Sequence, residues 1–108
     1  MANTFKLKTK ANVGVSTSNV YVVPSATTTV VIGVTLANTT GSSINVGVGV
    51  TRASTDDVNL MKNVPIPQGS SFEFMSGNKV VLETADTLTV NCDSNNSVDA
   101  TLTIMEIT

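Results

Sequence analysis

The chain has 108 residues, with six Lys or Arg against eight Asp or Glu, so its net charge is −2. This length suits one compact domain and is too short for two. The acidic balance argues against a protein that binds nucleic acid by neutralising phosphates. No segment approaches the roughly 18 consecutive apolar residues that a membrane-spanning helix needs.

Val and Thr dominate the composition, with 17 residues each. Branching at Cβ restricts these side chains in helices and suits the pleated surface of a sheet. Charged residues make up only 13% of the chain, about half the usual fraction. The surface is therefore expected to be covered by Thr, Ser and Asn, and in part by a neighbouring protein.

The first expected strand lies near the N-terminus and has one apolar and one basic face. The alternating side chains are Phe5, Lys6, Leu7, Lys8 and Lys10. An edge strand often carries lysines that prevent uncontrolled pairing, and docking on an acidic partner is the alternative. We expect residues 1–10 to form an N-terminal strand or docking segment and residues 11–108 to form the β-domain.

After a short strand over 20–23, two long strands with continuous apolar faces are expected. The first face comprises Val30, Ile32, Val34 and Leu36. The second face comprises Ile44, Val46, Val48 and Val50. Gly47 and Gly49 lie opposite this second face. Because glycine weakens a strand, the pair indicates the close approach of another backbone, either within the domain or at a subunit interface.

The remaining chain continues with period two, and further strands are expected over 58–61, 72–74, 79–82, 88–92 and 98–104. Polar turns separate them, including one at 76–78. Asp86, just before a β-run, is expected to hydrogen-bond the backbone and set the register of the next strand. Eight or nine short strands at spacings near ten residues predict an all-β fold, a single antiparallel β-sandwich of jelly-roll-like type.

No residue constellation predicts catalysis. Histidine, the commonest acid–base group, is absent from the chain, so Ser-His-Asp and Cys-His arrangements cannot form. Asp56 and Asp57 are adjacent, and their side chains point apart in an extended chain. The one cysteine, Cys92, is expected to be a small buried hydrophobic residue. The sequence therefore predicts a non-enzymatic protein with no catalytic residue and no cofactor.

Metal and stacking sites are not expected either. One cysteine without histidine cannot complete a structural zinc site. The stretch 93–96 could offer oxygens to calcium, but an Asn/Asp turn is the simpler interpretation. With three Phe, one Tyr and no Trp, platforms that stack bases or sugars are disfavoured. The first residues do not form a secretory signal.

Six turn-and-strand segments carry a family resemblance. They are VYVVPS (20–25), VVIGV (30–34), LANTTG (36–41), VPIPQGSSF (64–72), GNKVVLE (77–83) and ADTLTV (85–90). They resemble small virion proteins of tailed bacteriophages, especially marine and cyanobacterial phages, and the resemblance extends from about residue 4 to residue 107. It implies a virion component that is made in the host bacterial cytoplasm, without choosing its station on the particle.

A rigid, charge-poor β-domain with a short N-terminal segment favours a capsid decoration or cement protein that binds the shell of the major capsid protein. Its homo-oligomer is expected to be a trimer, because small β-domains commonly occupy three-fold positions. The residues expected at partner contacts are Phe5, Lys6, Leu7, Lys8, Lys10, Gly47 and Gly49. The alternative is a tail, neck or fibre component that attaches to a receptor, and a hydrolase ranks last. No nucleic-acid or membrane partner is expected.

Overall fold

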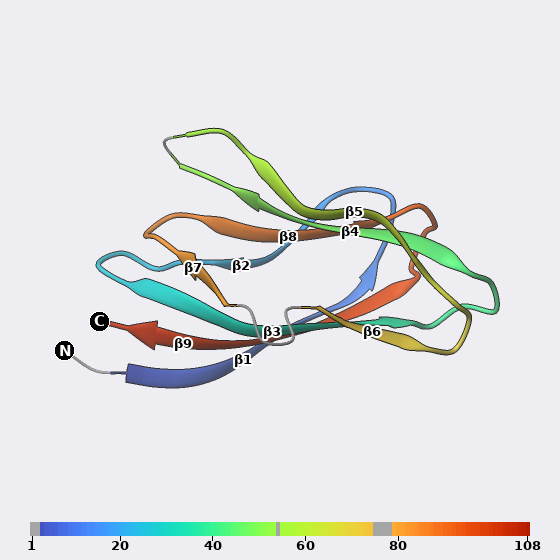
Figure 1. Ribbon diagram of the computed structural model, residues 1–108, viewed down its shortest axis with the longest axis horizontal. Helices are drawn as coiled ribbons and strands as arrows, with labels where there is room; N and C mark the ends of the chain where they lie inside the picture. Colours follow the sequence, from blue (N-terminus) through green and yellow to red (C-terminus); the bar gives the residue numbers. More distant parts are fainter. Residues whose placement is uncertain (1–2, 54, 75–78) are drawn as a thin grey trace.

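The computed structural model describes residues 3–53, 55–74 and 79–108. Over these residues the chain forms nine strands and no helix, and the strands build two antiparallel sheets packed face to face (Figure 1). The predicted all-β sandwich is confirmed. The turn expected at 76–78 lies outside the described residues.

The two sheets divide the strands as follows. Sheet I contains, in spatial order, β1 (Asn3–Val13), β9 (Val98–Ile107), β3 (Thr28–Asn38) and β6 (Ser71–Phe74), and β7 (Val80–Leu82) also pairs with β3. Sheet II contains, in spatial order, β2 (Ser18–Val22), β8 (Thr87–Cys92), β4 (Ile44–Thr51) and β5 (Val58–Ile66). β1 forms an edge of sheet I, and both chain ends lie at the same end of the sandwich (Figure 1).

The core lies between the sheets and is built from alternate residues of the central strands, as aligned sheets require. Its largest fully buried side chains include Leu36, Leu88, Leu102 and Ile104. The predicted inward face of β4, made of Ile44, Val46, Val48 and Val50, is confirmed by burial of all four. Cys92 is also buried, as expected.

The predicted inward face of β3 is wrong in its first half. That face was expected to contain Val30, Ile32, Val34 and Leu36. The register between β3 and β9 shifts between Val31 and Gly33, which marks a β-bulge with one extra residue. Before the bulge Val31 is buried and Val30 is half-buried on the outer face, whereas Val34 and Leu36 are buried after it. The bulge therefore moves two large apolar residues of β3, Val30 and Ile32, out of the core.

Candidate functional site

The two faces of β1 point in directions that its sequence did not reveal. Lys6, Lys8 and Lys10 pair with buried residues of β9, so the lysine row lies on the core side of sheet I. Phe5 and Leu7 point to the outer face, where their side chains are 71% and 63% exposed. The expected docking segment 1–10 is thus, from residue 3 onward, part of a continuous edge strand.

A buried polar cluster explains why the lysines face inward. Glu106 of β9 is only 5% exposed, and the Lys6 ammonium lies 2.9 Å from its carboxylate. The Tyr21 hydroxyl donates to the other oxygen of Glu106 and lies 2.8 Å from the hydroxyl of Thr29. Lys8 lies 5.9 Å from the centre of the Tyr21 ring, a cation–π contact. Lys6 and Lys8 therefore compensate a buried negative charge in their own chain.

The cluster also shifts the pKa values of its acidic groups. Hydrogen bonds from Tyr21 and Lys6 outweigh burial and lower the pKa of Glu106 below its ordinary value. Burial, together with the hydrogen bond to Glu106, raises the pKa of Tyr21 to about 12. At neutral pH Glu106 is therefore a carboxylate and Tyr21 a neutral phenol.

An apolar row crosses the outer face of sheet I. Register pairs Phe5 with Met105, Met105 with Val30, and Val30 with Val81, so four strands each contribute one apolar side chain. At the two ends of this apolar row, Phe5 is 71% and Val81 is 60% exposed, and Leu7 extends it along β1. Exposed apolar surface that is contiguous, rather than scattered, is typical of a protein interaction site.

The outer face of sheet II has no comparable row and instead contains a pocket of about 210 Å³. Gly47 and Gly49 are in its lining, together with polar residues of β5, β8 and the preceding loops. A Cβ atom at Gly47 would lie 2.6 Å from Oδ1 of Asn91, and one at Gly49 would lie 3.0 Å from the carbonyl oxygen of Val58. Both glycines are thus explained by close contacts within the chain.

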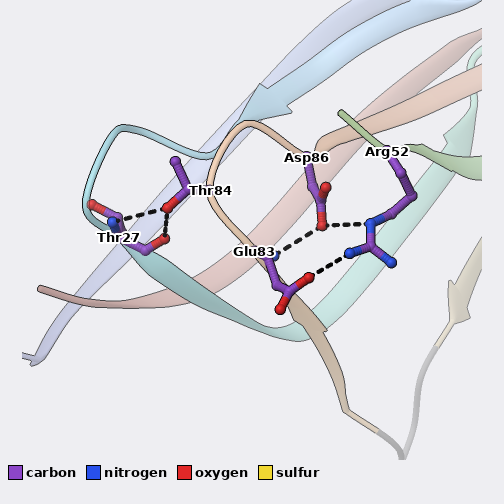
Figure 2. A network of polar contacts seen from close by, with 5 residues as sticks. All are labelled: Thr27, Arg52, Glu83, Thr84 and Asp86. Atoms are coloured by element: carbon purple, nitrogen blue, oxygen red, sulfur yellow. Dashed lines mark hydrogen bonds and ion pairs between the residues drawn. The ribbon is translucent and has the colours of Figure 1, made fainter. Parts of the chain in front are cut away.

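A second polar network joins the end of β4 to the turn between β7 and β8 (Figure 2). Asp86 is 3% exposed and accepts a hydrogen bond of 2.9 Å from the backbone N–H of Glu83, as the sequence predicted for its role in the turn. Arg52 Nε forms an ion pair of 2.9 Å with Asp86, and its Nη2 pairs with Glu83. Burial opposes ionisation of Asp86, but the backbone hydrogen bond and Arg52 outweigh it and lower its pKa.

Thr27 and Thr84 extend this network to the turn between β2 and β3 (Figure 2). The Thr84 hydroxyl donates to the Thr27 carbonyl at 2.8 Å and accepts from its N–H at 3.3 Å. Two turns that each connect one sheet to the other are therefore held together at one end of the sandwich. This arrangement fixes the structure of that end.

The remaining sequence candidates occupy turns. Asp57 accepts a hydrogen bond from the N–H of Arg52 at 3.2 Å, and Asp93 accepts one from Asn45 at 3.1 Å. In the described part of the chain, no three His, Cys, Asp or Glu side chains lie together as a metal site would require. The same residues contain no helix of the length and hydropathy needed to cross a membrane.

Sequence reasoning missed the residues that complete both surfaces. Met105, Val30 and Val81 join the apolar row only through cross-strand register, and Thr89 and Asn91 reach the pocket in the same way. The sequence signal for the apolar row was an apolar residue, such as Val81, at a strand position whose side chain alternates away from the core. The pairing that assembles them is not visible along the chain.

Comparison with known proteins reveals a structural likeness. No family model and no curated protein matches the chain. Among solved structures it is similar to a chain from Bacillus endospore appendages, which are described as a novel family of disulfide-linked pili. The TM-score is 0.59 at 12% sequence identity, over 99% of this chain and 87% of that chain. This likeness concerns the fold.

Proposed function

We propose that this chain is a structural protein of a tailed-bacteriophage virion that decorates the capsid by binding the shell of the major capsid protein. The observation that carries the proposal is the apolar row on the outer face of sheet I. Phe5, Leu7 and Val81 expose most of their side chains there. In a chain with so few charges, a covering partner would account for this exposure.

The position of the row suits docking on a large surface. It reaches β1, an edge strand, so a partner can approach from the side as well as from above. Lys6 and Lys8 are engaged with Glu106 and Tyr21, so the first groups that a partner meets are Phe5 and Leu7. We therefore propose an apolar contact on the capsid protein, not an acidic one.

Several copies are expected to act together, and we propose a homotrimer. The structurally similar Bacillus chain belongs to pili, which supports assembly from repeated β-domains. The pili are described as disulfide-linked, whereas this chain has one cysteine and it is buried. Its assembly would therefore be non-covalent. Sedimentation of the purified chain measures the oligomeric state, and a monomer at all concentrations would contradict the trimer.

The experiment that tests decoration replaces Phe5 and Leu7 together by Ser. Burial of such side chains contributes about 1.5–3 kcal/mol each, so occupancy on purified virions should fall at least about tenfold. Val22→Ser is the matched control, since Val22 is 52% exposed on the other sheet. Full occupancy of the double variant, with unchanged thermal unfolding, would contradict the proposal.

Point substitutions are preferable to deletion of the N-terminal segment. Deleting residues 1–10 would remove most of β1 and the Lys6 ammonium that compensates Glu106. Loss of particle binding after such a deletion could then result from unfolding alone.

A tail, neck or fibre component is the second candidate. It is favoured by the elongated shape, with extents of 45 × 25 × 22 Å, and by the likeness to a chain from pili. Labelling the chain on intact particles separates the two candidates. Many copies over the head support decoration, and a few copies at one vertex support a tail or neck position.

A further inference from the structure

We propose that the pocket on the outer face of sheet II binds a single neutral sugar ring. This site is separate from the apolar row, which lies on the other sheet, and the proposal does not depend on the station of the chain on a particle. Its polar lining includes Thr17, Asp57, Asn59, Thr89 and Asn91. The volume of about 210 Å³ suits one ring better than a drug-sized ligand.

The hydroxyl of a mostly buried threonine of β8 lies at this pocket. Thr89 is 8% exposed, and its Oγ1 lies over Gly49, 3.2 Å from the position that a Cβ atom would take there. Within the described residues, this hydroxyl forms no hydrogen bond. The Thr89 hydroxyl is therefore available to donate or accept a hydrogen bond with a ligand in the pocket.

Two amides converge on the same space. Oδ1 of Asn91 would lie 2.6 Å from a Cβ of Gly47, and Oδ1 of Asn59 would lie 3.5 Å from a Cβ of Gly49. Neither amide has a hydrogen-bond partner among the residues that the structure describes. Amides and hydroxyls both donate and accept hydrogen bonds, as sugar hydroxyls do. Because Gly47 and Gly49 have no side chains, these amides can approach the backbone closely and form the floor of the pocket.

The charge of the lining selects against other ligands. The lining residues include no Lys or Arg, so phosphate and sulfate lack a counter-charge there. Asp57 is the one carboxylate in the lining, and its Oδ1 accepts from the Arg52 N–H. Calcium sites use several carboxylate and carbonyl oxygens, and a single carboxylate is a weak basis for one.

The affinity of one pocket is expected to be low. No aromatic side chain lines it, so the stacking contribution of about 1 kcal/mol or more that aromatic rings provide is missing. Repetition of the pocket over a multi-copy assembly would raise the overall affinity by avidity. The test therefore needs a method that detects weak binding to the isolated chain.

The experiment is an NMR titration of the ¹⁵N-labelled chain with glucose, galactose and N-acetylglucosamine separately, and with calcium chloride in another series. At least one sugar should shift the backbone amides of Gly47, Gly49, Thr89 and Asn91 in a saturable manner. Thr89→Val keeps the side-chain shape but removes the hydroxyl, and should weaken binding about tenfold. Thr101→Val, on the half-buried outer face of sheet I, should bind as well as the natural chain.

Three outcomes would overturn the proposal. The first is that no sugar shifts the pocket amides. The second is that calcium alone shifts them, which would define a cation site. The third is equal sugar affinity of the natural chain and the Thr89→Val variant. Thermal unfolding serves as the folding control, and removal of an unpaired hydroxyl should leave stability equal or higher.

Discussion

The outer faces of the two sheets have opposite chemistry although they cover the same core. Sheet I presents the apolar row, in which Phe5 on β1 and Val81 on β7 are exposed at the two ends. Sheet II presents glycine backbone at Gly47 and Gly49, surrounded by amides and hydroxyls. A flat apolar surface suits another protein, whereas a small polar pocket suits a small ligand.

The difference arises from side-chain size at equivalent positions of a central strand. On β3 a bulge turns Val30 and Ile32 outward, and on β4 the outward positions are occupied by Gly47 and Gly49. The inner face of β4 is apolar at Ile44, Val46, Val48 and Val50, and that of β3 is apolar between its buried Thr29 and Asn38. One core can therefore support two different surfaces, because strand residues alternate between faces.

The largest expected effect on stability concerns the Asp86 network, at the turn between β7 and β8. Asp86→Ala removes a buried acceptor of the Glu83 N–H and leaves Arg52 without its buried partner. We expect a loss of about 3 kcal/mol in the free energy of unfolding. Chemical denaturation measures it. Glu83→Ala is the control, because the Glu83 side chain is 72% exposed and should cost less than about 1 kcal/mol. Equal losses in the two variants would contradict this account.

Protonation of Asp86 and Glu106 should also lower the free energy of unfolding, by less than the Asp86→Ala substitution does. The folded-state pKa values of Asp86 and Glu106 are lowered, so their stabilisation is full above the ordinary carboxyl pKa of about 4 and is lost as the pH falls below it. The folded-state pKa of Tyr21 is raised to about 12. Its contribution is therefore present below about pH 10 and is lost as the pH rises toward 12.

Tyr21→Phe separates the two limbs of this pH profile. The variant lacks the phenol, so the alkaline loss due to Tyr21 should disappear. It also lacks the hydrogen bond to Glu106, so the folded-state pKa of Glu106 should rise toward its ordinary value. The acid loss due to Glu106 should therefore be smaller and should be complete at a higher pH. Thermal unfolding followed from pH 3 to pH 12 measures both, and an unchanged profile would contradict the assigned causes.

A pair of matched glycine substitutions tests the contrast between the faces directly. Gly49→Ala places a Cβ 3.0 Å from the Val58 carbonyl oxygen, and such overpacking costs about 1–3 kcal/mol. Gly33→Ala, on sheet I, meets nothing within 4 Å. It should be neutral or stabilise by about 0.5 kcal/mol, because alanine restricts the unfolded chain more than glycine does. Denaturant unfolding measures both variants, and equal changes in their free energy of unfolding would contradict the stated difference between the two faces.

The smallest effect is expected in the turn between β7 and β8. Ala85 has φ of 73°, in the left-handed region that disfavours residues with a Cβ. Ala85→Gly should therefore stabilise the fold by at most about 1 kcal/mol, reduced by the greater freedom of glycine in the unfolded chain. Differential scanning calorimetry measures the change, and a clear destabilisation would show that the Ala85 methyl makes a contact of its own.

The fold was largely predictable from local patterns. Alternation along β4 correctly placed Ile44, Val46, Val48 and Val50 in the core, because the side chains of a strand alternate with period two. The same rule gave a wrong face for β3, since a bulge at Val31 and Gly33 shifts the alternation by one residue. Bulges depend on the partner strand, so local composition did not reveal it.

The two candidate surfaces were only partly predictable. Phe5, Leu7, Gly47 and Gly49 were selected from the sequence, and the structure places the first two on one sheet and the glycines on the other. Lys6, Lys8 and Lys10, which lie on the opposite face of β1, were also expected at a partner contact. Lys6 instead pairs with Glu106, a residue about one hundred positions away whose burial depends on the whole sandwich.

The sequence alone determined the class of fold and the available chemistry. Its Val and Thr content and its period-two pattern specify strands, and the absence of histidine and the single cysteine limit the reactions open to the chain. Tertiary structure decided which side chains meet. The apolar row and the pocket each combine residues from distant strands, and their register is set by bulges, turns and core packing. Such cross-strand neighbours have no period along a chain, so only the folded sheets bring them together.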